Sequence, residues 1–267
     1  MQLTKRMVEK PWGKEVLPAP FIAPEGRRIG EVWFEPPAEL PDILVKYIFT
    51  SEKLSVQVHP SDAQAAALAE SDRGKEECWL VIDAEPGATL GVGFKQEIGS
   101  EDMRRAALDG TIEDLMTWYP VAAGDFFYIP AGTVHAIGAG VSLIEIQQNS
   151  DITYRLYDYG RPRELHLDKG IEVAKGVPLD DSRHRSVSRN GTVQLVDGPY
   201  FMMHRLDGQP DKNLLAAYDG PSLVIPRAAP VMIGSDLLVP GDCGLVNGLR
   251  GTQFPDEGAT LLVRALA

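Results

Sequence analysis

The stretch Phe126-Phe127-Tyr128-Ile129-Pro130-Ala131-Gly132-Thr133-Val134-His135 joins an apolar run to a turn signal and a histidine. Residues 126–129 favour a buried strand, and the proline and glycine that follow favour a tight turn. A chain that reverses at this turn would direct His135 back into the interior of a β-sandwich. Short apolar runs separated by such turns extend over the whole chain.

Other short runs with β-branched or alternating residues predict further strands, most clearly at residues 43–49, 54–58, 79–82 and 143–146. The chain contains 20 prolines and 26 glycines, which punctuate these runs. Strands this short and numerous favour a β-sandwich or barrel over a parallel sheet with helices between its strands. We therefore expect a mainly β protein with a few short helices inserted between strands.

Three helices are expected between the strands. Ser61 can cap a helix over residues 63–70, and Ser100 can cap a second helix that ends at Gly110. Apolar residues within 112–119 follow i, i+3, i+4, i+7 spacing. This spacing predicts a third helix that lies on the sheet.

The chain is predicted to form two units. Residues 176–190 are polar and charged with few apolar side chains, which is typical of a connection. We place the boundary near residue 185, between an N-terminal unit of residues 1–185 and a smaller C-terminal β unit of residues 186–267. Strands of the second unit are predicted at residues 192–196, 223–225, 231–233 and 260–263.

Composition and charge limit the function classes. A net charge of −12 and an isoelectric point near 4.9 argue against nucleic-acid binding, which needs a basic surface. An anionic substrate would need a local basic pocket. The two cysteines, Cys78 and Cys243, indicate neither a disulfide framework nor a thiolate zinc site. Because no secretion signal or membrane span is recognisable, we expect a cytoplasmic protein.

Strand alternation brings metal-binding side chains together in Val56-Gln57-Val58-His59-Pro60. Gln57 and His59 would share one face of the strand, and both valines would share the other. Taken alone, the two polar residues could instead belong to a strand with one face in water.

The same alternation in Gly74-Lys75-Glu76-Glu77-Cys78-Trp79 puts Lys75 beside Glu77, opposite Glu76 and Cys78. By itself this pair could be a surface ion pair, and His135 could be a hydrogen-bonded core residue. A suitable set for one divalent ion such as Zn²⁺, with a position open to water or substrate, is Gln57, His59, Glu77 and His135.

A dense polar stretch over residues 145–158 follows His135 and contains Glu145 and Arg155. It predicts a pocket wall in which the arginine would hold an anion. The alternative is an exposed hairpin, in which Arg155 would stack on the neighbouring Tyr154 and Tyr157.

These segments resemble the type I mannose-6-phosphate isomerases of the short bacterial form, which belong to the cupin superfamily. The shared motifs, in family order over roughly residues 10–170, are KPWG, IGEVW, LSVQVHP, GKEECW, DAEPGA, DGTIEDL, GDFFYIPAGTVHAIG, IEIQQNSDITYRLYDYGR and RELHLDK. The sequence departs from the family at residues 12–15, where members often have PWGG, and matches only loosely from about residue 187. The resemblance implies cupin-type jelly-roll sandwiches, with a catalytic N-terminal unit and a degenerate cupin-like C-terminal unit.

Carried over by motif, the resemblance places the metal ligands at Gln57, His59, Glu77 and His135. It also implies an active-site arginine at Arg155, a site lysine at Lys75 and a proton-transfer base at Glu145. The implied reaction interconverts mannose 6-phosphate and fructose 6-phosphate, with Zn²⁺ or another divalent ion polarising the C1 and C2 oxygens. The implied partner is a phosphosugar, with no nucleic acid, membrane or organic cofactor, and the chain would act as a monomer or homodimer.

Two alternatives stay open from the sequence. A cupin oxygenase, or an isomerase of a different phosphosugar, could use the same ligands, because one fold hosts many chemistries. A sugar-binding cupin without catalysis could keep the fold, although Lys75, Glu145 and Arg155 around an open metal position argue for turnover.

Overall fold

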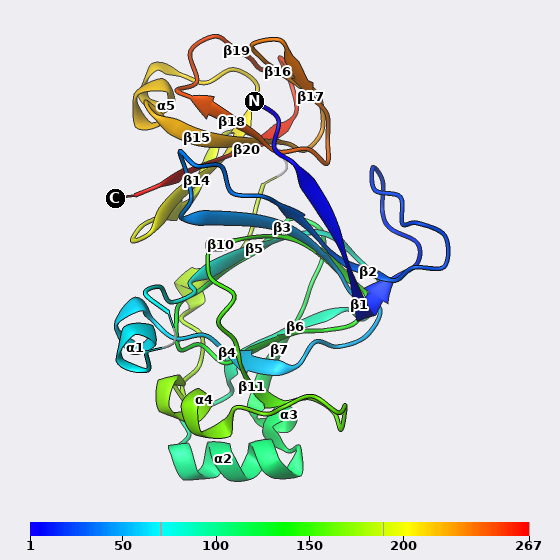
Figure 1. Cartoon of the computed structure of the whole chain (residues 1–267), viewed down its shortest axis with the longest axis vertical. Coiled ribbons are helices and arrows are strands. Elements are labelled where there is room, and N and C mark those ends of the chain that lie inside the picture. The colour runs from blue at the N-terminus through cyan, green and yellow to red at the C-terminus, as the bar shows by residue number, and fades with distance from the viewer. Residues whose placement is uncertain (70, 189, 267) are drawn as a thin grey trace.

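The structure is a computed structural model that describes residues 1–69, 71–188 and 190–266. It is mainly β, as predicted, and its sheets are stacked in layers (Figure 1). A C-terminal unit lies at one end, a seven-stranded sheet crosses the middle, a five-stranded sheet follows, and short helices cover the far end.

The seven-stranded and five-stranded sheets form the N-terminal sandwich. The strand order of the first is β1 (Lys5–Lys14), β2 (Ile29–Phe34), β3 (Ile43–Phe49), β10 (Val141–Gln148), β5 (Glu77–Ala84), β8 (Asp125–Ile129) and β12 (His184–Ser186). The order of the second is β11 (Tyr154–Tyr157), β4 (Val56–Val58), β9 (His135–Ile137), β6 (Thr89–Phe94) and β7 (Met116–Pro120). The pairs in both sheets are antiparallel.

The C-terminal unit contains two smaller sheets. One has the order β13 (Val193–Asp197), β14 (Phe201–Asp207), β20 (Ala259–Ala265), β15 (Pro221–Pro226) and β18 (Gly244–Asn247). The other has the order β17 (Asp236–Leu238), β16 (Val231–Ile233) and β19 (Thr252–Gln253). The helices are α1 (Asp62–Ala67), α2 (Ser100–Asp109), α3 (Ile112–Leu115), α4 (Leu167–Val173), α5 (Lys212–Ala217) and the 3₁₀ turn η1 (Asp181–Arg183).

The central strands of the seven-stranded sheet, such as β3 and β10, are buried on both faces. Leu143 of β10 and Trp79 of β5 point into the sandwich and belong to its inner core. Ile144 and Cys78, the neighbouring residues on the same strands, point the other way and share a core with Met203 of the C-terminal unit. Because successive strand residues point to opposite faces, one sheet separates the inner core from a core shared by both units.

The five-stranded sheet carries helices on its outer face. Val56 and Val58 of β4 pack there with Met103 of α2 and Ile171 of α4. Gln57 lies between the two valines and therefore faces the interior of the sandwich, as strand alternation predicts. The helices thus fix which face of β4 the candidate ligands use.

The strand predictions are largely confirmed. β3 and β16 have the predicted bounds, and β5, β8, β10, β15 and β20 extend the predicted runs. β13 is shifted by one residue, β4 is shorter than the predicted residues 54–58, and His135 begins β9 after the predicted turn. These strands lie in antiparallel sheets, so the predicted sandwich class is confirmed.

The helix after Ser61 is shorter than predicted. Ser61 caps α1 as expected and forms a capping box with Gln64, but the helix ends at Ala67. Residue 70 of the predicted helix lies outside the described residues.

Two further helix predictions need correction. Ser100 is the first helical residue of α2, and Gly99 is its N-cap; the predicted stop at Gly110 is confirmed by a positive φ of 86°. The predicted helix over residues 112–119 ends after one turn, because β7 begins at Met116 and pairs with β6. Apolar residues at 116 and 119 suit either structure, and the open edge of β6 decides in favour of a strand.

The chain remains with the N-terminal sandwich beyond residue 185, since β12 pairs with β8 as far as Ser186. The N-terminus also reaches the C-terminal unit, where Leu3 N donates to Cys243 O at 2.9 Å. The division at residue 185 stays a prediction, and residue 189 of the predicted connection lies outside the described residues. Within the described residues, no helix has the length and apolar character needed to cross a membrane.

Candidate metal centre

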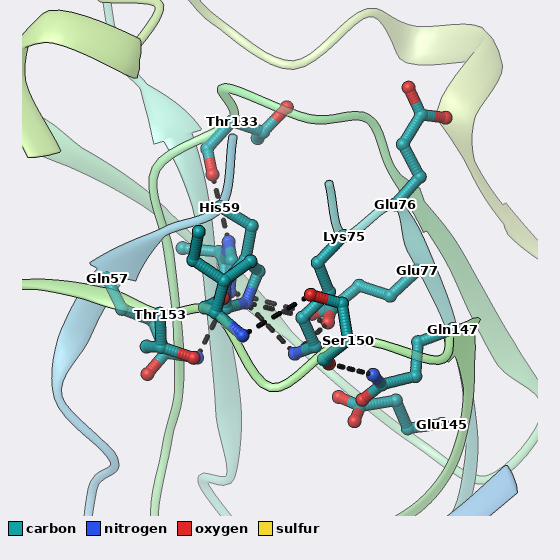
Figure 2. Close-up of polar contacts among 12 residues, drawn as sticks. Gln57, His59, Lys75, Glu76, Glu77, Thr133, Glu145, Gln147, Ser150 and Thr153 are labelled. Atoms are coloured by element: carbon teal, nitrogen blue, oxygen red, sulfur yellow. Dashed lines mark hydrogen bonds and ion pairs between the residues drawn. The ribbon is translucent and has the colours of Figure 1, made fainter. Parts of the chain in front are cut away.

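Strands of both sheets bring the candidate ligands together inside the sandwich (Figure 2). Gln57 of β4 pairs with His135 of β9, and His59 follows directly after β4. Glu77, the first residue of β5, reaches them from the opposite sheet. The ligand atoms of His59, Glu77 and His135 lie within 4.8 Å of one another.

Backbone carbonyls orient both histidines. His59 Nδ1 lies 2.8 Å from Ile152 O, and His135 Nδ1 lies 2.9 Å from Thr133 O. A carbonyl only accepts, so each Nδ1 carries the hydrogen and each Nε2 keeps its lone pair. These Nε2 atoms lie 3.6 Å from Oε2 and 3.5 Å from Oε1 of Glu77, respectively. Metal-binding histidines are oriented by hydrogen bonds of this kind.

Glu77 is fully buried, and its oxygens accept no well-aligned hydrogen bond from the described residues. The ammonium of Lys75 balances its charge, with Nζ 2.6 Å from Oε2 and 3.1 Å from His59 Nε2. Glu76 points away from this cluster (Figure 2), in agreement with the predicted alternation. The carboxylate is therefore paired as a charge but keeps unused acceptor capacity.

Burial dominates the protonation of the cluster. It raises the pKa of Glu77 to about 7; the Glu145 charge adds to the rise and Lys75 opposes it. It lowers the pKa of His135 to about 4, and burial with the Lys75 charge lowers the pKa of His59 well below its ordinary value. Both imidazoles are therefore neutral at pH 7, which is the form that binds a metal ion.

The cluster fits a divalent ion of borderline softness. Two neutral imidazoles and a carboxylate form a common donor set for Zn²⁺ with an open position, and the Glu77 oxygens keep acceptor capacity for a cation beside the Lys75 contact. The Nε2 atom of Gln57 lies 3.3 Å from His135 Nε2, and a half-turn of this amide would present Oε1 instead. Iron or manganese would also be accepted, so these residues do not choose the ion.

A cavity of about 410 Å³ opens beside the cluster, within the usual size range for small-molecule pockets. The lining is more basic than acidic, although the whole chain carries a net charge of −12. The basic side chains are Lys10, Lys46, Lys75, Arg155 and Arg163, and the acidic ones are Glu31, Glu145 and Asp151. A local basic pocket of this kind can hold an anion.

Glu145 lines this cavity from the inner face of β10. Its Oε1 accepts a hydrogen bond from Lys46 Nζ at 3.2 Å, and its Oε2 accepts one from Trp79 Nε1 at 3.1 Å. Burial alone would raise its pKa, but the charges of Lys75 and Lys46 and these two hydrogen bonds hold the pKa at about 2. Glu145 is therefore an ionised carboxylate at neutral pH.

Arg155 lies on β11 opposite Gln57 and also lines the cavity. Its Nη1 donates to Glu164 O at 2.8 Å, whereas its buried Nε has no hydrogen-bond partner among the described residues. A buried donor without an acceptor is unusual in a folded protein and indicates a group placed for a ligand. Tyr154, its neighbour on the strand, is buried in the core under the helices.

Sequence reasoning missed Lys46, which donates to both Glu145 and Gln147 at the cavity wall. The available signal was a single lysine inside the apolar strand Ile43–Phe49. It also missed Glu31, whose Oε2 accepts from Trp33 Nε1 at 3.0 Å and lies 3.1 Å from Lys10 Nζ. Glu31 belongs to the motif IGEVW, which the prediction used only for the family resemblance.

The chain is similar in sequence to named isomerases. It is 40% identical over 171 residues to the mannose-6-phosphate isomerase of Streptococcus mutans, an alignment that covers 61% of this chain and 54% of that protein. It is 35% identical over 228 residues to Bacillus subtilis YvyI, provisionally named a mannose-6-phosphate isomerase, with 80% of this chain and 70% of that protein covered. The chain belongs to the mannose-6-phosphate isomerase family. No family model matches it.

The fold agrees with this family membership. The crystal structure of the mannose 6-phosphate isomerase from Bacillus subtilis matches with a TM-score of 0.79 at 26% identity, covering 98% of both chains. The predicted cupin-type fold is thereby confirmed. In sequence, the chain spans about half the length of the Streptococcus mutans isomerase and of Bacillus subtilis ManA, at 54% and 53%.

Proposed function

We propose that this chain is a metal-dependent aldose–ketose isomerase that interconverts mannose 6-phosphate and fructose 6-phosphate. The observation that carries this proposal is the convergence of His59, Glu77 and His135 beside a cavity rich in basic side chains. The names of the relatives supply the reaction and the substrate. The geometry supports a site that binds one cation and one anion side by side.

The proposed ion is Zn²⁺, held by Gln57, His59, Glu77 and His135. Bound there, it would supply Lewis-acid stabilisation for negative charge on the C1 and C2 oxygens of the open-chain sugar. The ammonium of Lys75 would then no longer be needed to balance Glu77. It could donate instead to a hydroxyl or to the phosphate of the substrate.

Arg155 and Lys46 are the proposed anion contacts. Arg155 has a buried Nε without a partner among the described residues, and a guanidinium matches the oxygens of phosphate or of an enediolate. The ammonium of Lys46 lies within the cavity wall, where it already contacts Glu145. Both charges would offset the repulsion between an anionic substrate and an acidic protein.

Glu145 is the proposed proton-transfer base. It is ionised at neutral pH and so can accept a proton, but a pKa of about 2 makes it a weak base. Loosening of the Lys46 contact when substrate binds would raise its basicity. In a Glu145→Gln variant we expect kcat to fall about 10²- to 10⁴-fold while zinc binding is kept; a normal kcat would remove Glu145 from the mechanism.

The organisation of the chain completes the proposal. Residues 1–185 would form the catalytic cupin unit, and residues 186–267 would form a degenerate cupin-like unit. The protein would work in the cytoplasm as a monomer or homodimer, with a phosphosugar as its partner. Its acidic composition supports the absence of a nucleic-acid partner.

The test is an assay of zinc-loaded protein for conversion of mannose 6-phosphate to fructose 6-phosphate. A chelator-treated sample and a His135→Ala variant serve as controls. Turnover that is lost in both would support the reaction and the site together. Stoichiometric zinc without turnover would contradict the proposed substrate, and oxygen uptake by an iron-loaded sample would favour a cupin oxygenase instead.

A further inference from the structure

Residues 74–76, which precede Glu77, lie outside any strand or helix, so other contacts must hold them in place. This segment carries Lys75 and leads into Glu77, where strand β5 begins. Lys75 and Glu77 point toward His59 while Glu76 points away (Figure 2). Small displacements of a site residue have large effects on binding and catalysis, so the fixation of this segment matters for the metal centre.

Three successive backbone N–H groups of the segment are held in place. Gly74 N–H donates to Asp62 Oδ1 at 2.7 Å, and Lys75 N–H donates to Pro60 O at 3.0 Å. Glu76 N–H donates to the side-chain Oε1 of Gln148 at 2.9 Å. The segment is therefore tied to the chain just after β4 on one side and to the end of β10 on the other.

One oxygen of Asp62 accepts hydrogen bonds both from the segment and from the end of β10. Its Oδ1 accepts from Gly74 N–H and also from Gln148 Nε2, at 2.9 Å. Asp62 lies three residues after His59 in the chain. Its carboxylate thus connects the chain segment of one candidate ligand, His59, to the segment that leads into another, Glu77.

The two chain segments approach closely at Gly74. A Cβ on Gly74 would lie 2.4 Å from Pro60 O and from Ser61 C, so the two chain segments are in direct contact. A glycine at this position permits the close approach. The hydrogen bond from Gly74 to Asp62 then fixes the register of that contact.

The C-terminal unit lies close to the same network. Tyr200, in the turn between β13 and β14, lies near Asp62, whose charge adds to burial in raising the pKa of the Tyr200 hydroxyl. Cys78, the residue after Glu77, has its Sγ 3.7 Å from Met203 Sδ of β14. The second unit therefore contacts the strand that follows the segment and lies near Asp62.

We propose that Asp62 is a positioning residue of the metal centre: its carboxylate holds the Lys75–Glu77 segment in register with His59. This inference rests on the proposed metal centre. The C-terminal unit contacts Cys78, the residue after Glu77, through Met203 and supplies none of the candidate ligands.

The test measures zinc affinity by competition with a chelator, and the absorption spectrum of the Co²⁺-loaded protein, in full-length variants without any sugar. Asp62→Ala removes the acceptor, and Asp62→Asn keeps an oxygen at the same place. Asp72→Ala is the matched control, because Asp72 is an exposed carboxylate in the same segment without a hydrogen bond from the described residues.

We expect Asp62→Ala to weaken zinc binding about 10- to 100-fold, the usual range for loss of a residue that orients metal ligands, and to change the Co²⁺ spectrum. Asp62→Asn and Asp72→Ala should stay close to wild type. If Asp62→Ala does not fold, Gln148→Leu, which breaks the tie to Glu76 N–H, should weaken zinc binding in its place.

Wild-type zinc affinity in folded Asp62→Ala or in Gln148→Leu would overturn the proposal, even if thermal stability falls. Equal weakening in Asp72→Ala would also overturn it, because the effect would then be one of net charge. A wild-type protein that binds zinc but fails to isomerise mannose 6-phosphate would remove the proposed reaction and leave the role of Asp62 intact.

Discussion

Lys75 balances the buried charge of Glu77, with Nζ 2.6 Å from Oε2. In a Lys75→Met variant Glu77 would lose this partner. Breaking a buried pair costs up to about 3–5 kcal/mol while the remaining group stays charged, and less where Glu77, whose pKa is already raised to about 7, takes up a proton. We expect a loss of this order in the free energy of unfolding of the metal-free protein, and recovery of most of it with bound Zn²⁺, because the ion would take over the balancing charge. Urea unfolding with chelator and with zinc measures both values.

The matched control for that variant is Lys10→Met. Lys10 pairs with Glu31 at 3.1 Å on the same cavity wall, but its side chain is 33% exposed. Because water screens the partly exposed Lys10, this pair contributes less than the fully buried one, so the variant should lose less stability and by the same amount with or without zinc. An equal loss for Lys75→Met in the presence and absence of zinc would contradict the charge-balance argument.

Replacing Arg155 would distinguish stabilisation of charge on the reaction intermediate from binding of the substrate. If its guanidinium acts on the charge of the intermediate, Arg155→Ala should lower kcat about 10²- to 10³-fold with little change in KM. Steady-state kinetics on mannose 6-phosphate measure this, and zinc content serves as the control for an intact site. A change confined to KM would assign Arg155 to phosphate binding alone.

At the scale of single residues, strand alternation predicted which side chains share a face of a strand. Gln57 and His59 share a face because Val56 and Val58 must be buried, and no knowledge of the partner sheet is needed for that step. Lys46 could not be assigned in the same way. Whether its face of β3 meets water, core or a site depends on which sheet packs opposite, and this is a property of the tertiary structure.

At the scale of the elements, the two glycines that flank α2 differ in backbone conformation. Gly110 ends the helix with φ of 86°, and a Cβ there would lie 2.9 Å from Tyr157 Oη. A non-glycine residue in this conformation costs about 1–2 kcal/mol, so Gly110→Ala should lower the melting temperature. Gly99, the N-cap, has φ of −78° and open space around a Cβ. Gly99→Ser should leave stability unchanged or raise it slightly, because serine is a favoured N-cap; a loss equal to that of Gly110→Ala would contradict the argument.

The stretch of residues 112–119 shows why element type was harder to predict than element position. Its apolar spacing fits a helix, and the first four residues do form α3. From Met116 onward the chain pairs with β6, with Met116 opposite Phe94 and Tyr119 opposite Leu90. An unpaired strand edge nearby outweighs local periodicity, and that edge is made by residues distant in sequence.

At the scale of the whole molecule, the core shared by both units predicts a single unfolding transition. Met203 has no exposed surface and contacts Cys78 across the boundary. Met203→Ala should destabilise the protein by about 2–5 kcal/mol, the range for truncating a buried methionine. Calorimetry should show one transition that moves to lower temperature as a whole.

The control variant is Leu237→Ala, because that side chain is 53% exposed on β17 and should cost less than about 0.5 kcal/mol. Two separate transitions, of which Met203→Ala shifts only one, would contradict a shared core. The two units would then unfold independently in spite of the contacts between them.

Burial of β10 on both faces has a consequence for genetics. Leu143 and Glu145 face the sandwich and its cavity, whereas Ile144 and Ile146 face the C-terminal unit. Substitutions at successive residues of β10 should therefore alternate between effects on the sandwich and its cavity and effects on the contact with the C-terminal unit. Second-site suppressors of damage at the even positions should map to the C-terminal unit, about 40 or more residues away in sequence. Suppressors of damage at Leu143 should map to the five-stranded sheet.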